Sequence, residues 1–512
     1  MAGLLAVCSA QKSKVRQPAA AGTFYPADAK ELARMVDDLL ARAKPPTVTE
    51  PVTALIVPHA GYVFSGGVAA HAYALLKDRK YERVVVISPS HIDAFSFSAI
   101  YDGDAYLTPL GAVPVDKAFA AKLARLGTGL QLSSRGHLSS SGRGEHALEV
   151  QLPFLQRVLG EFRLVAIVMG DQRYEACRNL GIALAKAVEG SQTLIVASSD
   201  LSHYHPYQDA VRLDRRVLKA IEEWDYYTMS RNFEQNIWEA CGGGPIVAAM
   251  IAAERLGSRQ ARLLKYANSG DVTGDRSQVV GYGAVALVSA PRAAGDGEAA
   301  AASFRLDEKD QQELLWLARK SVETIVRERK LYEGPAPHSP ALNEDRGAFV
   351  TLKKKGQLRG CIGYIFPMKP LYLTVRDVAA MAAVRDERFL PVKTAELDQL
   401  EYEISVLSPL RRVLDVKEIV VGKHGLVVKR GDREGLLLPQ VATEQHWDRM
   451  QFLQETCLKA GLPPNAWRDP ETDIFRFTAF VFGEQKRLSA APPAATPPAR
   501  AASSARPASK PF

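Results

Sequence analysis

The feature that most constrains the fold is a series of short apolar runs without polar alternation, separated by helical patterns. The runs are rich in Val and Ile and cover residues 54–57, 83–87, 163–169, 193–197 and 284–288. Between them, apolar residues recur with a helical period over residues 29–43, 68–76, 147–159, 174–188, 210–222 and 246–256. Strands without alternation are typical of parallel sheets that helices cover on both faces. The first part of the chain is therefore predicted to be an α/β sandwich, with a mainly parallel sheet flanked by helices.

The second part of the chain mixes its elements differently. Helices are expected over residues 307–329, 371–384 and 444–460, and strand-like pieces cover residues 347–353, 400–407, 425–429, 435–438 and 476–482. This order predicts a smaller α+β domain.

Two stretches have compositions that do not suit a packed core. Residues 291–303 are mostly small and predict a linker. Residues 489–512 are rich in Ala, Pro and Ser, hold six prolines and no acidic residue, and are expected to be disordered. We therefore expect a flexible N-terminus at 1–14, a first domain at 15–290, the linker, a second domain at 304–488 and the tail.

Composition limits the classes of function. The net charge of +8 is scattered over 512 residues, and the densest basic cluster, at 353–359, is short, so nucleic-acid binding is not favoured but stays open. The five cysteines form no CxxC pair, which argues against a disulfide scaffold and for a reducing, cytoplasmic location. No apolar run approaches the ~18 residues that a membrane span needs, so no membrane association is expected.

Chemically active side chains follow three of the predicted strands. His59 comes just after the run at 54–57, His91 follows the run at 83–87, and Asp200 and His203 follow the run at 193–197. In open α/β sheets, ligands bind at the carboxyl ends of the strands. If these strands are neighbours, the four side chains converge on one site.

Cys241 adds a thiol to this set. It precedes three glycines and Pro245, which is a favourable first residue for the helix predicted at 246–256. A thiol at a helix amino terminus is expected to have a lowered pKa. A small buried Cys in a turn is the alternative, but beside two strand-end histidines a metal ligand is the better interpretation.

Glu145 and His146 open the helix predicted at 147–159. The preceding residues 139–144 are Ser- and Gly-rich and predict a mobile loop. Glu145 either satisfies the start of the helix or enters the site together with His146 as a catalytic group, and the sequence does not separate the two.

Two imidazoles with one anionic ligand and open positions suit non-haem Fe(II), whereas Zn or Cu would accept the same donors. His59, His91 and Cys241 are the predicted metal ligands. Asp200 and His203 would then support these ligands or act as an acid/base pair.

The residues of this candidate site belong to motifs that resemble those of Memo proteins. The motifs that carry the resemblance occur in order at residues 15–26 (VRQPAAAGTFYP), 58–62 (PHAGY), 88–91 (SPSH), 145–149 (EHALE), 198–203 (SSDLSH) and 241–242 (CG). The resemblance implies a fold shared with class III extradiol dioxygenases of the LigB type. It matches His59 and His91 to two Fe(II) ligands and His203 to the acid/base His. Cys241 stands where those dioxygenases have Glu, which puts ring cleavage in doubt.

The second domain is similar to the AMMECR family, whose LRGCIG hallmark occurs within residues 357–363. Residues 402–408 and 435–441 also fit that family. From the residues alone, Arg359, Gly360 and Cys361 are expected in a tight turn, where Arg359 could lower the pKa of a catalytic thiol. A buried structural Cys is slightly favoured over that reading. Glu403 could face the same cavity.

Both resemblances point to the AmmeMemoRadiSam system, of which this chain joins the B and A proteins, and imply a radical SAM partner. No CxxxCxxC occurs, so the chain is not expected to bind the radical SAM cluster itself. Three functions stay open: a metal-dependent oxidoreductase, a scaffold that keeps a dioxygenase fold without its chemistry, and an accessory protein in the modification of protein or RNA.

Overall fold

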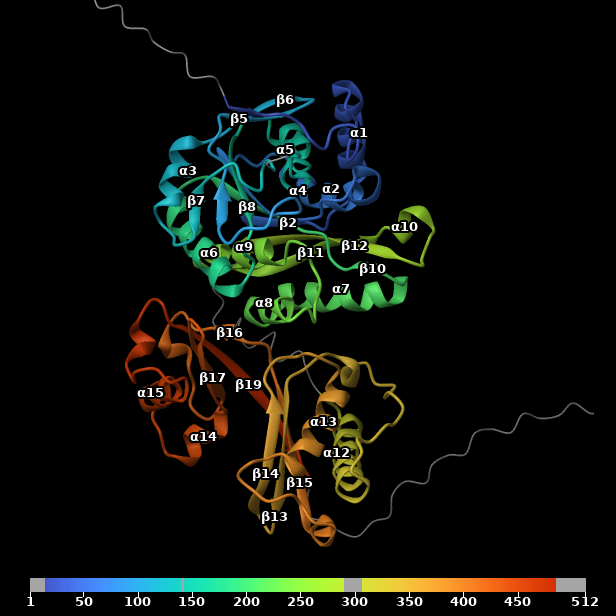
Figure 1. Cartoon of the computed structure of the whole chain (residues 1–512), viewed down its shortest axis with the longest axis vertical. Coiled ribbons are helices and arrows are strands. Elements are labelled where there is room, and N and C mark those ends of the chain that lie inside the picture. The colour runs from blue at the N-terminus through green and yellow to red at the C-terminus, as the bar shows by residue number, and fades with distance from the viewer. Residues whose placement is uncertain (1–13, 140–141, 290–305, 485–512) are drawn as a thin grey trace, which may run out of the picture.

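The computed structural model describes residues 14–139, 142–289 and 306–484, which form two domains, one above the other in Figure 1. The predicted linker (291–303) and the predicted tail (489–512) lie outside the described residues. The predicted flexible N-terminus (1–14) lies outside them too, except for Lys14.

The first domain is built around a nine-stranded sheet with the order β10-β12-β2-β9-β3-β8-β4-β7, to which β11 adds beside β12. Its strands are β2 (Val52–Val57), β3 (Arg83–Pro89), β4 (Ser98–Ile100), β7 (Leu130–Leu132), β8 (Arg163–Met169), β9 (Thr193–Ser198), β10 (His203–His205), β11 (Ser258–Asn268) and β12 (Val279–Ser289). The central strands β2, β9, β3 and β8 run parallel. A small sheet of β1 (Val15–Arg16), β5 (Ala105–Thr108) and β6 (Gly111–Pro114) lies beside it.

Helices cover both faces of this sheet (Figure 1). One face packs against α1 (Ala29–Arg42), α2 (Gly67–Ala74), α4 (His146–Glu149) and α5 (Leu152–Leu159), and the other against α3 (Lys117–Ala124), α6 (Tyr174–Val188), α7 (Tyr207–Glu222), α8 (Tyr226–Glu234) and α9 (Gly243–Arg255). In β3, Val84 and Val86 enter one hydrophobic core while Val85 and Ile87 enter the other. Burial on both faces explains why the strands show no polar alternation.

Two expectations for this domain are corrected. The run at 284–288 belongs to β12, which is antiparallel to β2 and not parallel, because β12 returns directly from β11 after the short helix α10 (Gly270–Thr273). The helix predicted at 147–159 is two helices, α4 and α5. Pro153 has no N–H to donate and its ring clashes with the carbonyl four residues earlier, which breaks the helix between them.

The second domain is an antiparallel sheet with helices on it. The order is β14-β13-β15-β19-β17-β18, and β16 adds beside β19. Its elements are α12 (Glu308–Glu328), β13 (Ala348–Lys354), β14 (Gln357–Tyr364), α13 (Leu371–Val384), β15 (Leu400–Leu407), β16 (Arg411–Arg412), β17 (His424–Arg430), β18 (Arg433–Leu437), α14 (Pro439–Glu444), α15 (Arg449–Lys459) and β19 (Asp473–Gly483). α12 and α13 share one hydrophobic core with β13 and β15, and α15 shares a second one with β17.

The turn expected at Arg359–Cys361 lies elsewhere. These residues are within β14, and the chain reverses at Lys355 and Gly356, which have φ values of 54° and 78°. Two successive residues with positive φ are typical of a two-residue hairpin turn. Gly360 is needed within the strand because a Cβ there would lie 2.2 Å from the Ala382 carbonyl oxygen of α13.

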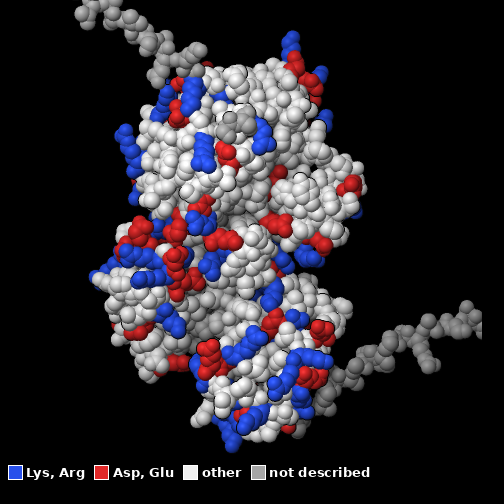
Figure 2. Space-filling view, in the orientation of Figure 1, with Lys and Arg blue, Asp and Glu red and all other residues white. Residues whose placement is uncertain are grey.

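Basic and acidic side chains are interspersed over both domains on the face shown in Figure 2. This face therefore presents no broad basic surface of the kind that nucleic-acid binding requires. Among the helices of the described residues, none has the length and apolarity needed to cross a membrane.

Candidate metal centre

The candidate site lies at the carboxyl ends of three neighbouring central strands of the first domain's sheet. β9 lies between β2 and β3, and all three run parallel, so their carboxyl ends meet. His59, His91 and Asp200 each follow two residues after the end of one of these strands. The crevice expected from the sequence is therefore formed by adjacent strands.

Cys241 enters the same point from the amino end of α9. The Cys241 Sγ lies 3.1 Å from His59 Nε2, and one ligand atom each from His59, His91 and Cys241 all lie within 4.8 Å of one another. A Cβ on Gly242 would lie 2.2 Å from the Ser198 carbonyl oxygen, so only glycine lets the backbone pass this closely over the end of β9. The three side chains predicted as metal ligands are thus brought together.

The hydrogen bonds around His59 determine which ring nitrogen faces the thiol. Ser198 Oγ donates its single proton to the Ala147 carbonyl at 2.7 Å and accepts a hydrogen bond from Gln151 Nε2 at 2.8 Å. The 3.0 Å contact between His59 Nδ1 and Ser198 Oγ must then have Nδ1–H as the donor. The lone pair of His59 Nε2 consequently points at Cys241, as a metal ligand requires.

Glu145 orients His91 in the same manner. Its carboxylate accepts hydrogen bonds from the His91 backbone N–H at 2.6 Å and from His91 Nδ1 at 2.9 Å. Burial by itself raises the pKa of Glu145, but its contacts with His91 dominate and lower that pKa to about 2. Burial lowers the pKa of His91, and the bond and charge of Glu145 outweigh it and raise that pKa. A carboxylate behind a ligating imidazole fixes the ring and strengthens its basicity.

Burial controls the protonation of the remaining groups. It lowers the pKa of His59 to about 3 and that of His146 to about 4, so both rings are neutral near pH 7. Burial, and then the neighbouring Asp200, raise the pKa of the Cys241 thiol. The lowered thiol pKa expected from the helix terminus is therefore wrong for the metal-free protein, because burial and the Asp200 carboxylate oppose ionisation of the thiol.

His146 lies beside the predicted ligands. Its ring centroid is 4.7 Å from that of His91 and 5.6 Å from that of His59. Its Nδ1 is 3.3 Å from Glu145 Oε1, and its other neighbour is Phe24, which stacks on it at 4.2 Å. His91, Glu145 and His146 form a second group whose ligand atoms lie within 4.8 Å of one another. Glu145 thus both caps α4 and enters the site.

Asp200 and His203 occupy different positions. Asp200 is buried, its Oδ1 accepts the His59 backbone N–H at 2.7 Å, and its Oδ2 lies 3.9 Å from His59 Nε2. Burial raises the pKa of Asp200. His203 begins β10, which pairs with β12 at the sheet edge, and its ring makes no hydrogen bond to the cluster within the described residues. His203 therefore stands close enough to Asp200 to act on its charge, without a hydrogen bond to it in the described residues.

A buried ion pair beneath the site was not anticipated from the sequence. Glu149 accepts hydrogen bonds from Arg16 Nη1 at 2.5 Å, from the Ala19 and Ala20 backbone N–H groups at 2.8 Å, and from the Tyr25 hydroxyl at 2.5 Å. Both charged side chains are fully buried. This network holds the segment that carries Phe24 against α4. The roles of Ser198 and Gln151 were missed as well. Ser198 belongs to the SSDLSH motif at 198–203, whereas no motif marks Gln151.

The loop expected to be mobile is closed by backbone bonds where it is described. Ser139 N donates to the Arg143 carbonyl at 2.8 Å, and Gly142 N donates to the Ser139 carbonyl at 3.0 Å. Residues 140 and 141 lie outside the described residues.

The second-domain candidates do not form an activated thiol site. Burial raises the pKa of Cys361, whose Sγ accepts a 3.3 Å hydrogen bond from Thr351. Arg359 instead pairs with Glu396 at 3.0 Å, so the expected effect of Arg359 on the thiol is corrected. Glu403 lies opposite Thr351 in the sheet and binds Lys353 at 2.8 Å. Glu403 and Cys361 thus flank Thr351 on the same sheet face.

Comparison with known proteins assigns both domains. The sequence model of the Memo-like protein family matches residues 16–286, and that of the AMMECR1 family matches residues 315–482. A MEMO1 family protein of Methanopyrus kandleri is 40% identical over 281 residues, which are 53% of this chain and 98% of that protein. Another, from Aeropyrum pernix, is 39% identical over 284 residues, covering 53% of this chain and 99% of that protein.

Among solved structures, an uncharacterised protein from Pyrococcus horikoshii is 41% identical and covers 36% of this chain and 95% of its own, with a TM-score of 0.34. The two family matches together span most of the described residues. The chain belongs to the Memo-like protein family, and an AMMECR1 domain follows its Memo domain.

Proposed function

We propose that the Memo domain binds one Fe(II) ion through His59, His91 and Cys241 and acts as a metal-dependent oxidoreductase. The observation that carries this proposal is the convergence of the three ligand atoms within 4.8 Å of one another. Two imidazoles and one thiolate with open positions suit Fe(II), and Zn or Cu would use the same donors.

The donor set fits a metal better than it fits a packed core. Ser198 and Glu145 each accept the Nδ1 proton of one imidazole, which leaves both Nε2 lone pairs for the ion. Cys241 is protonated in the metal-free protein and must lose its proton when it binds, so affinity should rise with pH. The Asp200 backbone N–H points at Cys241 Sγ at 3.3 Å and would stabilise the thiolate.

The surrounding residues have distinct roles in this proposal. Bound iron supplies redox and Lewis-acid chemistry. Asp200 and His146 lie beside the proposed ligands and would accept or deliver protons there. His203 would influence the charge of Asp200 from β10. Phe24 shields one face of His146 from water.

The fold is proposed to be related to that of class III extradiol dioxygenases, with Cys241 in place of their ligating Glu. A thiolate changes the redox potential of the centre and is itself open to oxidation, so the substrate need not be a catechol. We place the protein in the cytoplasm, beside a radical SAM partner in the AmmeMemoRadiSam system. A scaffold role would not need the two separate networks that orient the imidazoles.

Anaerobic purification with metal analysis tests the proposal. The wild-type chain should hold about one iron per chain, whereas Cys241→Ser and His59→Ala should lose it. Cys361→Ser and His71→Ala are matched controls, because they remove a thiol and an imidazole outside the cluster, and both should keep the metal. Equal metal content in Cys241→Ser and Cys361→Ser would contradict the proposal.

A further inference from the structure

The AMMECR1 domain packs against the side of the Memo domain that carries Cys241. The thiol stands at the end of the connection between α8 and α9, which covers residues 235–242. The core of the Memo domain on this side is continuous with side chains of β19, including Phe475 and Phe477. The second domain therefore shares a hydrophobic core with the side of the Memo domain on which α8 and α9 lie.

Helix α8 is held by the second domain along its length. The carboxylate of Asp225, which caps the helix, accepts the Leu410 backbone N–H at 3.2 Å. The Tyr227 ring stacks on Phe475 with centroids 4.6 Å apart, and the Tyr227 hydroxyl donates to the Glu434 carboxylate. The second domain therefore contacts α8, the helix that precedes the Cys241 connection, through hydrogen bonds and a ring stack.

Asn232 joins this anchored helix to the connection that ends at Cys241. Its side-chain Nδ2 donates to the Pro367 carbonyl of the second domain at 3.1 Å. Its own carbonyl accepts the backbone N–H groups of Ile237 at 2.8 Å and Trp238 at 3.3 Å. Asn232 is 1% exposed. One residue therefore contacts the second domain through its side chain and holds the Cys241 connection through its backbone.

The two imidazole ligands are positioned independently of the second domain. His59 and His91 follow central strands, and their orienting partners, Ser198 and Glu145, also belong to the first domain. Cys241 is also held by the first domain, because Gln172 Nε2 donates to its carbonyl at 3.0 Å and the Gly242 N–H donates to Ser199 Oγ at 3.0 Å. Among the three ligands, Cys241 is therefore the one that the second domain can reach, through the connection at 235–242.

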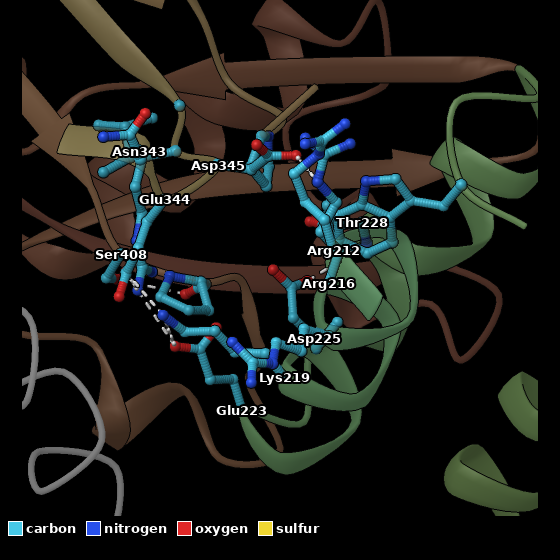
Figure 3. Close-up of a pocket in the computed structure, with 18 of the residues that line it drawn as sticks. Arg212, Arg216, Lys219, Glu223, Asp225, Thr228, Asn343, Glu344, Asp345 and Ser408 are labelled. Atoms are coloured by element: carbon cyan, nitrogen blue, oxygen red, sulfur yellow. Dashed lines mark hydrogen bonds and ion pairs between the residues drawn. The ribbon is translucent and has the colours of Figure 1, made fainter. Parts of the chain in front are cut away.

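A cavity of 530 Å³ lies between the domains, lined on the Memo side by α7, the start of α8 and Trp238 (Figure 3). Ion pairs join its walls: Lys219 to Glu344 at 2.6 Å and Arg216 to Asp345 at 3.0 Å. The cavity leaves part of the interface between the domains unpacked.

We propose that Asn232 is a positioning residue through which the AMMECR1 domain sets the place of the Cys241 ligand. Binding events on the AMMECR1 domain would then change metal affinity and thiol exposure at the Memo site. The metal part of this inference rests on the proposed metal centre, whereas the thiol part concerns the metal-free protein.

Two measurements on the full chain test the proposal. The first is titration with Co²⁺ alone, in which the thiolate-to-cobalt charge-transfer band reports ligation by sulfur. The second is the rate of Cys241 alkylation in the metal-free protein, read by peptide mass spectrometry. Asn232→Ala removes the hydrogen bond to the Pro367 carbonyl and keeps the backbone carbonyl of residue 232. It should weaken Co²⁺ binding and speed alkylation, both measurably against the wild-type chain. Lys219→Ala is the matched control, because it removes an interdomain ion pair that does not touch the connection, and it should change neither quantity.

The outcomes distinguish failure of the proposed metal centre from failure of the positioning role of Asn232. A wild-type chain without a charge-transfer band would overturn the proposed metal centre. A wild-type band with unchanged affinity and alkylation in Asn232→Ala would overturn the positioning role, as would an equal change in Lys219→Ala. If Asn232→Ala does not fold, Tyr227→Phe replaces it, since it keeps the ring stack and loses only the contact with Glu434. A smaller change in the same direction is expected there, and no change would contradict the proposal.

Discussion

Replacement of Glu149 by Gln should destabilise the Memo domain by an amount that follows from its burial. The Glu149 carboxylate and the Arg16 guanidinium are both fully buried and 2.5 Å apart. Two backbone N–H groups and the Tyr25 hydroxyl also donate to the carboxylate. Glu149→Gln keeps the shape but leaves the guanidinium as a buried, uncompensated charge, which costs about 3–5 kcal/mol. His146 should also become more exposed, because Phe24 belongs to the segment that the network holds.

Hydrogen exchange followed by mass spectrometry suits this test, since peptides from β3 report the unfolding free energy of the first domain separately from that of the second. Arg157→Ala is the control, because its ion pair with Asp37 joins side chains that are 40% and 48% exposed. That variant should lose no more than about 0.5 kcal/mol. A loss below about 1 kcal/mol for Glu149→Gln would refute the reasoning from burial.

Three further outcomes follow from the geometry. Ser198→Ala removes the acceptor of the His59 Nδ1 proton and should weaken Co²⁺ binding about 10–100-fold; unchanged affinity would contradict the proposed orientation. Gly242→Ala should lower thermal stability by about 1–3 kcal/mol, because its Cβ would lie 2.2 Å from a carbonyl oxygen, and an unchanged melting temperature would disagree. Hydrogen bonds from Arg388 lower the pKa of Asp386 to about 2. The stability from Asp386 is therefore complete above about pH 4 and lost as the pH falls towards 2; urea unfolding of Asp386→Asn should show a smaller loss over that range, and an identical loss would count against the ion pair.

Elements that depend on local pattern were predictable from the sequence. The apolar run at 163–169 and the helical period at 174–188 coincide with β8 and α6. The convergence of His59, His91 and Asp200 followed from the parallel-strand pattern, because adjacent parallel strands end on the same side of the sheet. Cys241 could be included because glycines and a proline mark the start of α9.

Features that depend on contacts between distant segments were not predictable in this way. Burial on both faces gives β12 the same apolar run whether it is parallel or antiparallel. Glu145 and Glu149 are only about one helical turn apart in the sequence. Nevertheless, the Glu145 carboxylate orients His91, whereas the Glu149 carboxylate pairs with Arg16. Desolvation, which raises the pKa of Cys241, depends on the whole fold and not on the adjacent helix.

X-ray absorption spectroscopy of the anaerobically iron-loaded chain tests the central claim most directly, because it identifies the atoms around the ion. The account predicts one sulfur and two imidazole nitrogens in the wild-type protein, and loss of the sulfur in Cys241→Ser. A coordination shell of oxygen and nitrogen alone in the wild-type protein, or a sulfur that persists in Cys241→Ser, would contradict it.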